Sequence, residues 1–532
     1  MSIWSGHLSV RGPQDLEDLA TAGWLSGTLF AALELGVFEA LGTDEAPVDE
    51  VAARVGAEPQ AFRRLAEALG TLGLLSFCDG RVACTTVARR HLLPGGEAYL
   101  GHSLLYRQQL AANWSLLADA VRRGGSPMAP TPDEGEGYQR RVRRYLLAMD
   151  DVARHKARCI AERVHLDRLP ARADGRERFV LDLAGGGGAV AAELVRRDPA
   201  WRGVVVDMPE VVEQAQQMWA GRGSPPRLSY VGLDLLSAAL PVPPGGGRQW
   251  DVIVLSNIVH AFAEAESGRL LDDAAAAVAP GGLVIVHDFW TDGPGRGPAK
   301  AALFDLHMMV NTYQGRSYSW AWVRDRLVAG GLVAVAPVPL GEEHTQEDTS
   351  LVVAARDPRS LAAVDVSPLE RLGSAALELG FARSARLDPA AVVTAAWVRE
   401  KCRFGCSGYD KGAQCPPRSP APEETRELLR GYSAALLVQG EPPTASFHLQ
   451  MLALERAAFL QGHPRALAFA AGPCRLCPEC TPDACIRPDE ARPSMEAAGI
   501  DVYGLAQAVG WHLQPVPDHE SPVTYLGLLL VD

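Results

Sequence analysis

The chain has 532 residues, 47% of them hydrophobic and 22% charged, and a formal net charge of −13. A single hydrophobic core stops growing at about 250–300 residues, so we expect two or three domains. The acidic balance, without a long Lys/Arg block, argues against nucleic-acid binding through phosphates and favours a small-molecule substrate. The start, "MSIWSGHLSVRGPQDLEDLA", lacks a signal-peptide pattern, and no apolar run is long enough to cross a membrane. We therefore expect a cytoplasmic protein.

The first expected domain, residues 1–115, is helical. Helical apolar spacing runs through "LFAALELGVFEAL" and "VDEVAARVGAEPQAFRRLAEALGTLGLL", and the short pair "LSFCDGRVACT" follows. Helices that end in a small hairpin are typical of a winged-helix unit, although the charge balance argues against a DNA-binding use. Further helices are expected near residues 99–122 and 138–166.

The second expected domain, residues 116–356, has a parallel doubly wound α/β sheet. Its strands are "FVLDLA", "GVVVDM", "LSYVGLD", "WDVIVLSNI" and "GGLVIVHDF", with helical segments between them. A boundary follows near residues 356–366. Beyond it, "AALLVQGE", "RALAFAAG" and "TYLGLLLVD" alternate with helices expected at 446–461 and 494–509. Residues 366–532 should therefore form a smaller α/β domain.

A glycine turn follows the first strand of the sheet. In "FVLDLAGGGGAVAAELVRRDPAWRGVVVDM" a strand, a turn with Gly185 and Gly186, a helix and a second strand ending in Asp207 follow one another. Glycines let a ligand approach the backbone closely, and an acid about 20 residues on can accept hydrogen bonds from ribose hydroxyls. The pattern predicts a nucleotide-type site.

Several stretches in order carry a family resemblance. They are "LGVFEAL", the glycine turn, "VVVDMPEVVEQA", "VGLDLLSAALP", "DVIVLSNIVHAF", "APGGLVIVHDFW" and "LFDLHMMVNTYQGRSYSWAWVRDRLVAGGL". Residues of about 14–356 resemble the S-adenosylmethionine (SAM)-dependent class I small-molecule O-methyltransferases of the caffeate and polyketide type. The resemblance implies a homodimer formed through the N-terminal helices and SAM bound by Gly185, Gly186, Asp207, Asp234 near the adenine, and Ser256. Ser256 stands where plant members have a lysine, and Ala184 stands where the family has its first turn glycine.

The same resemblance implies the catalytic residues. His260, after the fourth strand, matches the general base, and Asp288, after the next strand, matches the carboxylate that orients it. Two departures stand out: Ala261-Phe262 replaces the family's Asp-Trp pair, and the second supporting acid falls at Ser317 or its neighbours. An apolar and aromatic substrate pocket is expected from Trp114, Met149, Phe304, His307, Met308, Asn311 and Trp320.

Seven of the ten cysteines lie beyond residue 400. The first group is Cys402, Cys406 and Cys415, and the second is Cys474, Cys477, Cys480 and Cys485, near Pro488. A C-x2-C-x2-C run is typical of [4Fe–4S] ligation. Zinc more often uses two separated C-x2-C knuckles, and zinc or unligated thiols are the alternatives. The first group could complete a second site.

The stretches "REKCRFGCSGYDKGAQCPPRSPAPEET", "ALERAAFLQGHPRALAFAAGPCRLCPEC" and "CIRPDEARPSMEAAGIDVYGLA" resemble small Cys-rich prokaryotic proteins known only as predicted metal-binding, over residues of about 365–515. We expect a SAM-dependent methyltransferase of a small aromatic or natural-product substrate, with an iron–sulfur domain that assists or prepares the substrate. One alternative is a non-methylating enzyme of the same fold, performing cyclisation, decarboxylation or redox tailoring with the cluster. The other is a metal- or redox-responsive binding protein with a degenerate transferase half.

Overall fold

A computed structural model describes residues 10, 12–96, 98–126, 135–171, 175–222, 227–245, 249–291, 299–340, 349–511, 513 and 523–532. The chain divides into two compact units, with the division between Asp365 and Val366. The first two expected domains lie together in the first unit, and the Cys-rich part forms the second. None of the helices in the described ranges is long and apolar enough to span a membrane.

The N-terminal part of the first unit pairs helices with a small antiparallel sheet of order β1-β3-β2. Phe38, Phe62 and Leu69 form the centre of its core and are almost fully buried. The arrangement confirms the helices and hairpin that the periodicity predicts. The elements are α1 (Pro13–Thr21), α2 (Gly23–Glu34), α3 (Val37–Leu41), β1 (Glu45–Pro47), α4 (Val48–Arg54), α5 (Pro59–Thr71), β2 (Leu75–Cys78), β3 (Arg81–Cys84) and α6 (Thr86–His91).

The first two helices present large apolar side chains to solvent. Leu16 and Leu19 on α1 and Trp24 and Leu25 on α2 are between 57 and 74% exposed, and α1 buries no residue. Apolar side chains concentrated on adjoining helices mark an interaction surface.

Helices then connect this part to the large sheet: α7 (Gly101–Ala111), the 3-10 turn η1 (Ala112–Leu116), α8 (Leu117–Arg123) and the 29-residue α9 (Gly135–Arg163). Two buried carboxylates fix α9 to its neighbours. Asp151 accepts hydrogen bonds from the backbone amides of His102 and Ser103 on α7. Asp150 pairs with Arg222 at 2.5 Å, which connects α9 to the end of α11. Buried charges need such partners, so these pairs set the position of α9.

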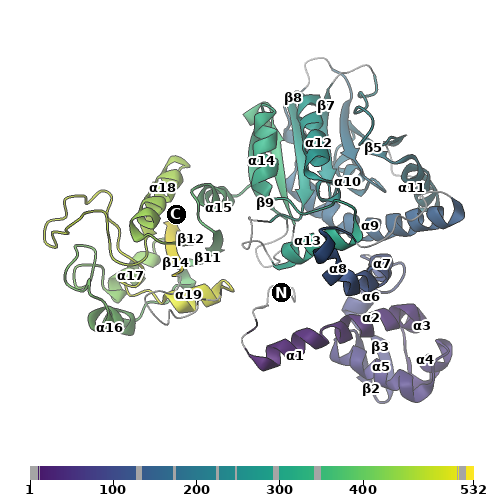
Figure 1. Ribbon diagram of the computed structural model, residues 1–532, viewed down its shortest axis with the longest axis horizontal. Coiled ribbons are helices and arrows are strands. Elements are labelled where there is room, and N and C mark those ends of the chain that lie inside the picture. Colours follow the sequence, from purple (N-terminus) through teal and green to yellow (C-terminus); the bar gives the residue numbers. More distant parts are fainter. Residues whose placement is uncertain are drawn as a thin grey trace. The chain divides into compact units, whose positions relative to one another are not determined.

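The large sheet has seven strands in the order β6-β5-β4-β7-β8-β10-β9. Figure 1 labels β5, β7, β8 and β9 of this sheet. Its strands are β4 (Arg178–Leu183), β5 (Trp201–Asp207), β6 (Leu228–Gly232), β7 (Trp250–Ser256), β8 (Val278–Asp288), β9 (Val333–Pro339) and β10 (Ser350–Ala355). The first five strands are parallel, as expected. However, β10 runs antiparallel to both β8 and β9, so the expectation of a parallel sheet is corrected to a mixed one. Ten residues separate β9 from β10, fewer than a crossover between parallel strands needs, so these neighbouring strands run antiparallel.

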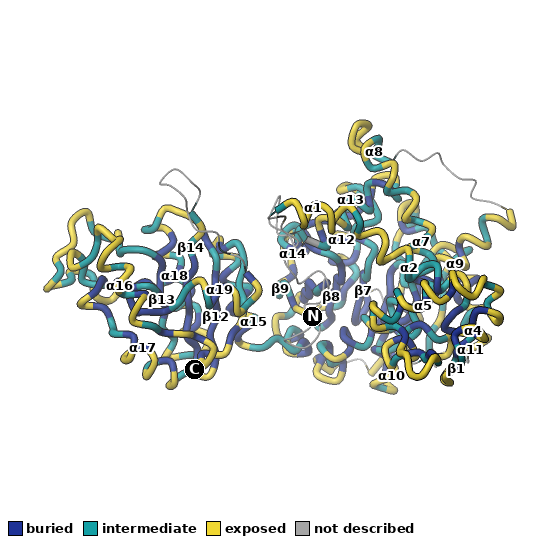
Figure 2. Tube along the Cα trace, turned by 90° about the horizontal axis from the view of Figure 1, so that it is seen from below, coloured by how far each residue is buried: buried dark blue, intermediate teal, exposed yellow. Residues whose placement is uncertain are grey.

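Helices cover this sheet, and its central strands are almost wholly buried (Figure 2). The helices are α10 (Ala189–Arg197), α11 (Pro209–Arg222), α12 (Glu264–Ala277), α13 (Ala299–Asn311) and α14 (Trp320–Ala329), with 3-10 turns η2 (Leu166–Arg168), η3 (Val259–Ala261) and η4 (Pro358–Ala363). Since parallel strands end on one edge of a sheet, the residues that follow them gather there.

The second unit has a four-stranded antiparallel sheet of order β11-β12-β14-β13. Alternate residues of β14 enter two different cores: Leu529 packs with Phe447 and Met451, and Leu528 packs with Met495 and Ile500. Helices therefore bury both faces of the sheet. The elements are α15 (Pro368–Glu378), β11 (Arg383–Leu387), η5 (Pro389–Ala391), α16 (Ala396–Gly405), α17 (Pro422–Leu429), β12 (Ala434–Gly440), α18 (Thr444–Leu460), β13 (Leu467–Phe469), α19 (Val502–Ala508) and β14 (Tyr525–Val531).

The helix expected at 494–509 is shorter than predicted. Only Val502–Ala508 is helical, and Ser494 instead bridges to Ala470. Gly499 lies at φ +79°, in the left-handed region that a continuing helix cannot use. The glycine therefore separates a turn from the short α19.

Candidate functional site

The carboxyl edge of the parallel strands brings together most of the predicted catalytic and cofactor-binding residues. Asp207, Ser256 and Asp288 are the last residues of β5, β7 and β8, and His260 lies in the 3-10 turn that follows β7. Gly185 and Gly186 lie in the turn between β4 and α10.

The glycine turn is tied to Asp207. The amide of Gly186 donates to Asp207 Oδ2 at 2.8 Å, and the amide of Met208 donates to Oδ1 at 2.8 Å. A Cβ on Gly185 would lie 2.6 Å from the carboxyl carbon of Asp182, so only glycine fits there. Each carboxylate oxygen of Asp207 can accept a further hydrogen bond. The turn and Asp207 therefore fit a nucleoside with two ribose hydroxyls.

Two buried acids lie beneath this turn. Burial raises the pKa of Asp207, and the two backbone amides partly oppose that effect. Burial raises the pKa of Asp182 to about 7, although the amide of Ala191 lowers it, and the charge of Asp207 adds to the rise. Asp182 Oδ1 has no hydrogen-bond partner among the described residues. Asp182 was not predicted from the sequence, because nothing in "FVLDLA" distinguishes it from an ordinary strand residue.

Ala184 occupies a strained position in the same turn. Its φ is +51°, in the left-handed region where a Cβ costs about 1–3 kcal/mol. The family resemblance places a glycine there, and the structure gives the physical reason for that preference.

Asp234 and Ser256 already have partners within the chain. Asp234 accepts from the amide of Leu236 at 2.9 Å and from the hydroxyl of Ser237 at 2.8 Å, within its own turn. Ser256 Oγ lies 2.8 Å from Nδ1 of the buried His287. Burial lowers the pKa of His287 to about 3, so this ring is neutral. Contact of Asp234 and Ser256 with SAM stays a prediction.

His260 and Asp288 form a close pair. His260 Nδ1 lies 2.5 Å from Asp288 Oδ1, and the His260 amide donates to Asp288 Oδ2 at 3.2 Å. The carboxylate is 2% exposed and the imidazole 11%. Because Nδ1–H donates to the carboxylate, the proton-accepting lone pair of the neutral ring lies on Nε2. The pair can remove a proton from a bound hydroxyl.

A loop supports His260 where the family's second acid is absent. The amide of Arg316 donates to the carbonyl of His260 at 2.9 Å. The next residue, Ser317, donates its amide to Asp305 Oδ1 at 2.6 Å. Asp305 was not predicted. It lies on α13 and anchors the loop that holds Arg316 and Ser317, so a carboxylate supports this loop from α13 and not from the loop itself.

Aromatic rings lie beside His260. Phe304 meets the His260 ring edge-on at 4.9 Å and stacks on Phe289 at 4.2 Å and on His307 at 5.9 Å. Trp114 lies 6.1 Å from His307. These rings form a candidate platform for a flat substrate. Phe289 was not predicted, although it directly follows Asp288 in the sequence.

Two asparagine side chains near this platform are hydrogen-bonded to each other. Asn113 donates to Asn311 Oδ1 at 2.7 Å, which connects η1 to α13, and Asn311 donates to the carbonyl of His307. Met149 is half-buried on α9. Met308 and Trp320 are each 7% exposed, so they lie in the core, and their contact with a substrate stays a prediction.

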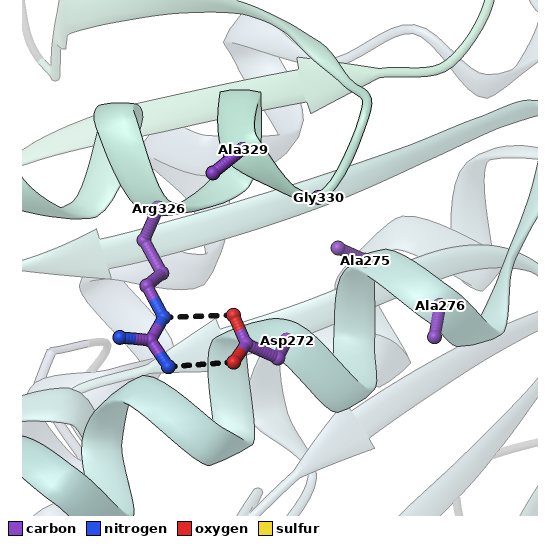
Figure 3. A pocket seen from close by; sticks show the side chains of 6 residues that line it. All are labelled: Asp272, Ala275, Ala276, Arg326, Ala329 and Gly330. Atoms are coloured by element: carbon purple, nitrogen blue, oxygen red, sulfur yellow. Dashed lines mark hydrogen bonds and ion pairs between the residues drawn. The ribbon is translucent and has the colours of Figure 1, made fainter.

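A separate groove lies between α12 and α14 (Figure 3). Asp272 and Arg326 form a bidentate ion pair across it, beside Ala275, Ala276 and Gly330. Asp272 lies eight residues, or about 12 Å along the helix, from the first turn of α12, the turn nearest His260. The two charges in the groove neutralise each other, and we assign it no chemistry.

The two cysteine groups lie together in the second unit. The amide of Ala413 donates to Cys480 Sγ at 3.4 Å, so the first group's loop contacts the second group. Cys474, Cys477, Cys480 and Cys485 line one small hollow. Burial is the main cause that raises the pKa of Cys415, and the thiols of Cys406, Cys480 and Cys474 add to it.

All ten cysteines are free thiols, and among the described side chains no three His, Cys, Asp or Glu residues are arranged to hold a single metal ion. An all-thiol set of donors suits soft metals. The chemistry of these residues therefore fits a metal–thiolate group.

Three family models match the chain. An O-methyltransferase dimerisation domain matches residues 17–93, an O-methyltransferase domain matches 147–324, and a predicted metal-binding protein (DUF2284) matches 385–531. The last match agrees with the resemblance of the Cys-rich part, and a metal is predicted there without its identity.

The chain is also similar to characterised proteins. It is 33% identical to the 3-hydroxy-5-methyl-1-naphthoate 3-O-methyltransferase of Streptomyces sahachiroi, over 59% of this chain and 88% of that protein. It is 28% identical to the 3-amino-4-hydroxybenzoate 4-O-methyltransferase of Streptomyces cremeus, over 63% of this chain and 89% of that protein. The fold is similar to that of human N-acetylserotonin methyltransferase in complex with SAM, with a TM-score of 0.56, 24% identity and coverage of 66% of this chain and 99% of that chain.

The strain at Ala184 leads to a first prediction. Ala184→Gly should raise the free energy of unfolding by up to about 1 kcal/mol, because glycine relieves the left-handed strain. The greater conformational entropy of the unfolded chain with glycine offsets part of this gain. Chemical denaturation measures this. The matched change Ala192→Gly, inside α10, should instead lower stability by about 1 kcal/mol. Equal losses from both changes would show that Ala184 is unstrained.

Proposed function

This chain belongs to the family of SAM-dependent small-molecule O-methyltransferases, and from that premise we propose that it methylates a hydroxyl group of a small aromatic natural product. The observation that carries the proposal is the buried His260–Asp288 pair, with Nδ1 and Oδ1 2.5 Å apart, at the same edge of the sheet as the glycine turn. An oriented imidazole that can act as a general base and a turn suited to a nucleoside therefore lie at the same edge of the sheet.

When bound, SAM supplies a methyl group on a sulfonium, and the sulfur keeps the bonding electron pair as the methyl group leaves. The protein's own residues align the acceptor and handle its proton. His260 Nε2 takes the proton from the acceptor hydroxyl, and Asp288 stabilises the imidazolium that results. Orientation can contribute about 7–11 kcal/mol to such a step, so the residues that position the acceptor matter as much as the base.

The rings beside His260 favour an aromatic acceptor. Phe304 and Phe289 stack at 4.2 Å and offer a flat apolar surface beside the imidazole. The two characterised relatives described above act on a hydroxynaphthoate and a hydroxybenzoate. A fused or single aromatic ring stacked on Phe304 places its hydroxyl toward His260.

For the second unit we propose a [4Fe–4S] cluster, with Cys474, Cys477, Cys480 and Cys485 as its ligands and Cys402, Cys406 and Cys415 as companions in the contacting loop. The four thiols line one hollow without converging on a single point. Each thiolate of such a cluster binds a different iron, so the ligands surround a body larger than one ion. In this assignment the cluster assists or prepares the substrate.

The exposed apolar side chains of α1 and α2 support a homodimer. Leu19, Trp24 and Leu25 lie in the part of the chain that matches the dimerisation domain, and Leu16 directly precedes it. Cysteines that are grouped for metal binding suit a reducing compartment, in keeping with the cytoplasmic location proposed from the sequence.

A change at His260 tests the proposed chemistry. His260→Ala should lower kcat by at least about 100-fold with SAM affinity intact, because the acceptor then loses its general base. Methyl transfer from labelled SAM and calorimetric SAM binding measure the two effects. The control is His165→Ala, which removes another His–Asp pair, with Nε2 and Asp365 Oδ2 2.6 Å apart. Turnover that survives in His260→Ala would contradict the base assignment.

Metal analysis tests the proposed cluster. Protein purified without oxygen should be brown and contain iron and acid-labile sulfide. Both should be lost when Cys474, Cys477 and Cys480 are changed to Ala, and kept when the exposed Cys78 is changed. Stoichiometric zinc without sulfide would refute the cluster.

The dimer is tested at α1 and α2. The double change Leu19→Asp and Trp24→Asp should halve the mass in solution, since it places two charges in the proposed apolar interface. Light scattering after size exclusion gives the mass. Val242→Asp, at a 67% exposed site outside this surface, should leave the mass unchanged. A dimer that persists in the double variant contradicts this interface.

A further inference from the structure

Arg107 is a cation without a partner in the part of the chain that the structure describes. It lies on α7, where Gln108 bonds Glu34 and Gln109 bonds Arg144. No hydrogen bond or ion pair from any described residue reaches the Arg107 guanidinium. A guanidinium has five donors, so those of Arg107 are available to a ligand that can displace solvent from them.

Arg107 lies on the side of α7 that faces the aromatic platform. Trp114 follows it by seven residues, or two helical turns, and Ala111 and Ala112 keep right-handed helical angles between them. Arg107 and Trp114 therefore share nearly the same face. The Trp114 ring lies 6.1 Å from His307, which stacks on Phe304.

Arg107 is exposed to solvent, and the protein atoms around it still lower the pKa of its guanidinium. Its charge also reaches the platform. Burial lowers the pKa of His307 to about 4, and the charge of Arg107 adds to this lowering, followed by that of His260. His307 is thus neutral, and Arg107 is a positively charged side chain whose field reaches it.

We propose that Arg107 binds a carboxylate on the aromatic acceptor and so selects hydroxyaryl acids as substrates. This inference rests on the proposed function. Arg pairs with carboxylate through two parallel hydrogen bonds, which fix the orientation of a planar acid as well as attract it. With the ring stacked on Phe304, the acid lies toward Arg107 and α7, and the hydroxyl lies toward His260. Arg107 is then a specificity residue, separate from the base.

Matched acceptors test the proposal. We choose 3-hydroxy-1-naphthoate, its neutral amide and 2-naphthol, and compare wild type, Arg107→Gln and Arg107→Lys. Wild type should favour the acid over the amide by at least about 10-fold in kcat/KM, the effect of one charge-assisted hydrogen-bonded pair. Arg107→Gln should lose that preference, chiefly through a fall in turnover of the acid, and Arg107→Lys should keep part of it.

The same three acceptors are titrated without turnover, in the presence of S-adenosylhomocysteine, so that a failure of methylation is distinguished from a failure of carboxylate binding. The proposal is supported if wild type binds the acid more tightly than the amide and Arg107→Gln does not, even if no methyl group is transferred. Equal binding of acid and amide by wild type overturns it. A loss of SAM affinity in Arg107→Gln also overturns the proposal, because it would mean that Arg107 binds the carboxylate of SAM and not that of the acceptor. A change in mass overturns it in favour of a pair with the partner subunit.

Discussion

The register of the parallel strands is the constraint on which the site depends. β4, β5, β7 and β8 pair in one direction, so the residues that follow them meet at one edge. Successive side chains of a strand point to opposite faces of the sheet, so His287 and Asp288 at the end of β8 contact different residues. His287 lies beside Ser256, whereas Asp288, one residue on, holds His260. A shift by one residue would exchange these roles, so the buried hydrophobic residues of the strands also fix the chemistry.

The fold class and the strand ends could be predicted because they depend on local patterns. Alternating strand and helix segments indicate a sheet, and His260 and Asp288 stand directly after two of its strands. The direction of β10 could not be predicted, since it depends on whether that strand inserts between β8 and β9 or extends the sheet beyond them. Gly499 shows a similar limit, because a glycine in a helical pattern ends the helix only when its φ is positive.

The neighbours of the candidate site were harder to predict than its centre. Phe289 and Asp305 act through contacts with residues of other elements, at 4.2 Å to Phe304 and 2.6 Å to Ser317. Arg107 lies in an ordinary helical sequence, and only the three-dimensional arrangement reveals that it lacks a partner. The cysteines differ, because their spacing alone indicates ligation while the identity of the metal depends on chemistry beyond spacing.

Asp182 couples the glycine turn to pH. Its pKa of about 7 means that the folded protein holds a proton there, between about pH 4 and 7, that the unfolded chain has released. This carboxyl therefore favours folding most at acidic pH, and its contribution is lost as the pH rises through 7. The charge of Asp207 helps to hold that proton. By reciprocity, a ligand that alters the field around Asp207 must also change proton occupancy at Asp182, and proton concentration must change the affinity for that ligand by the same factor.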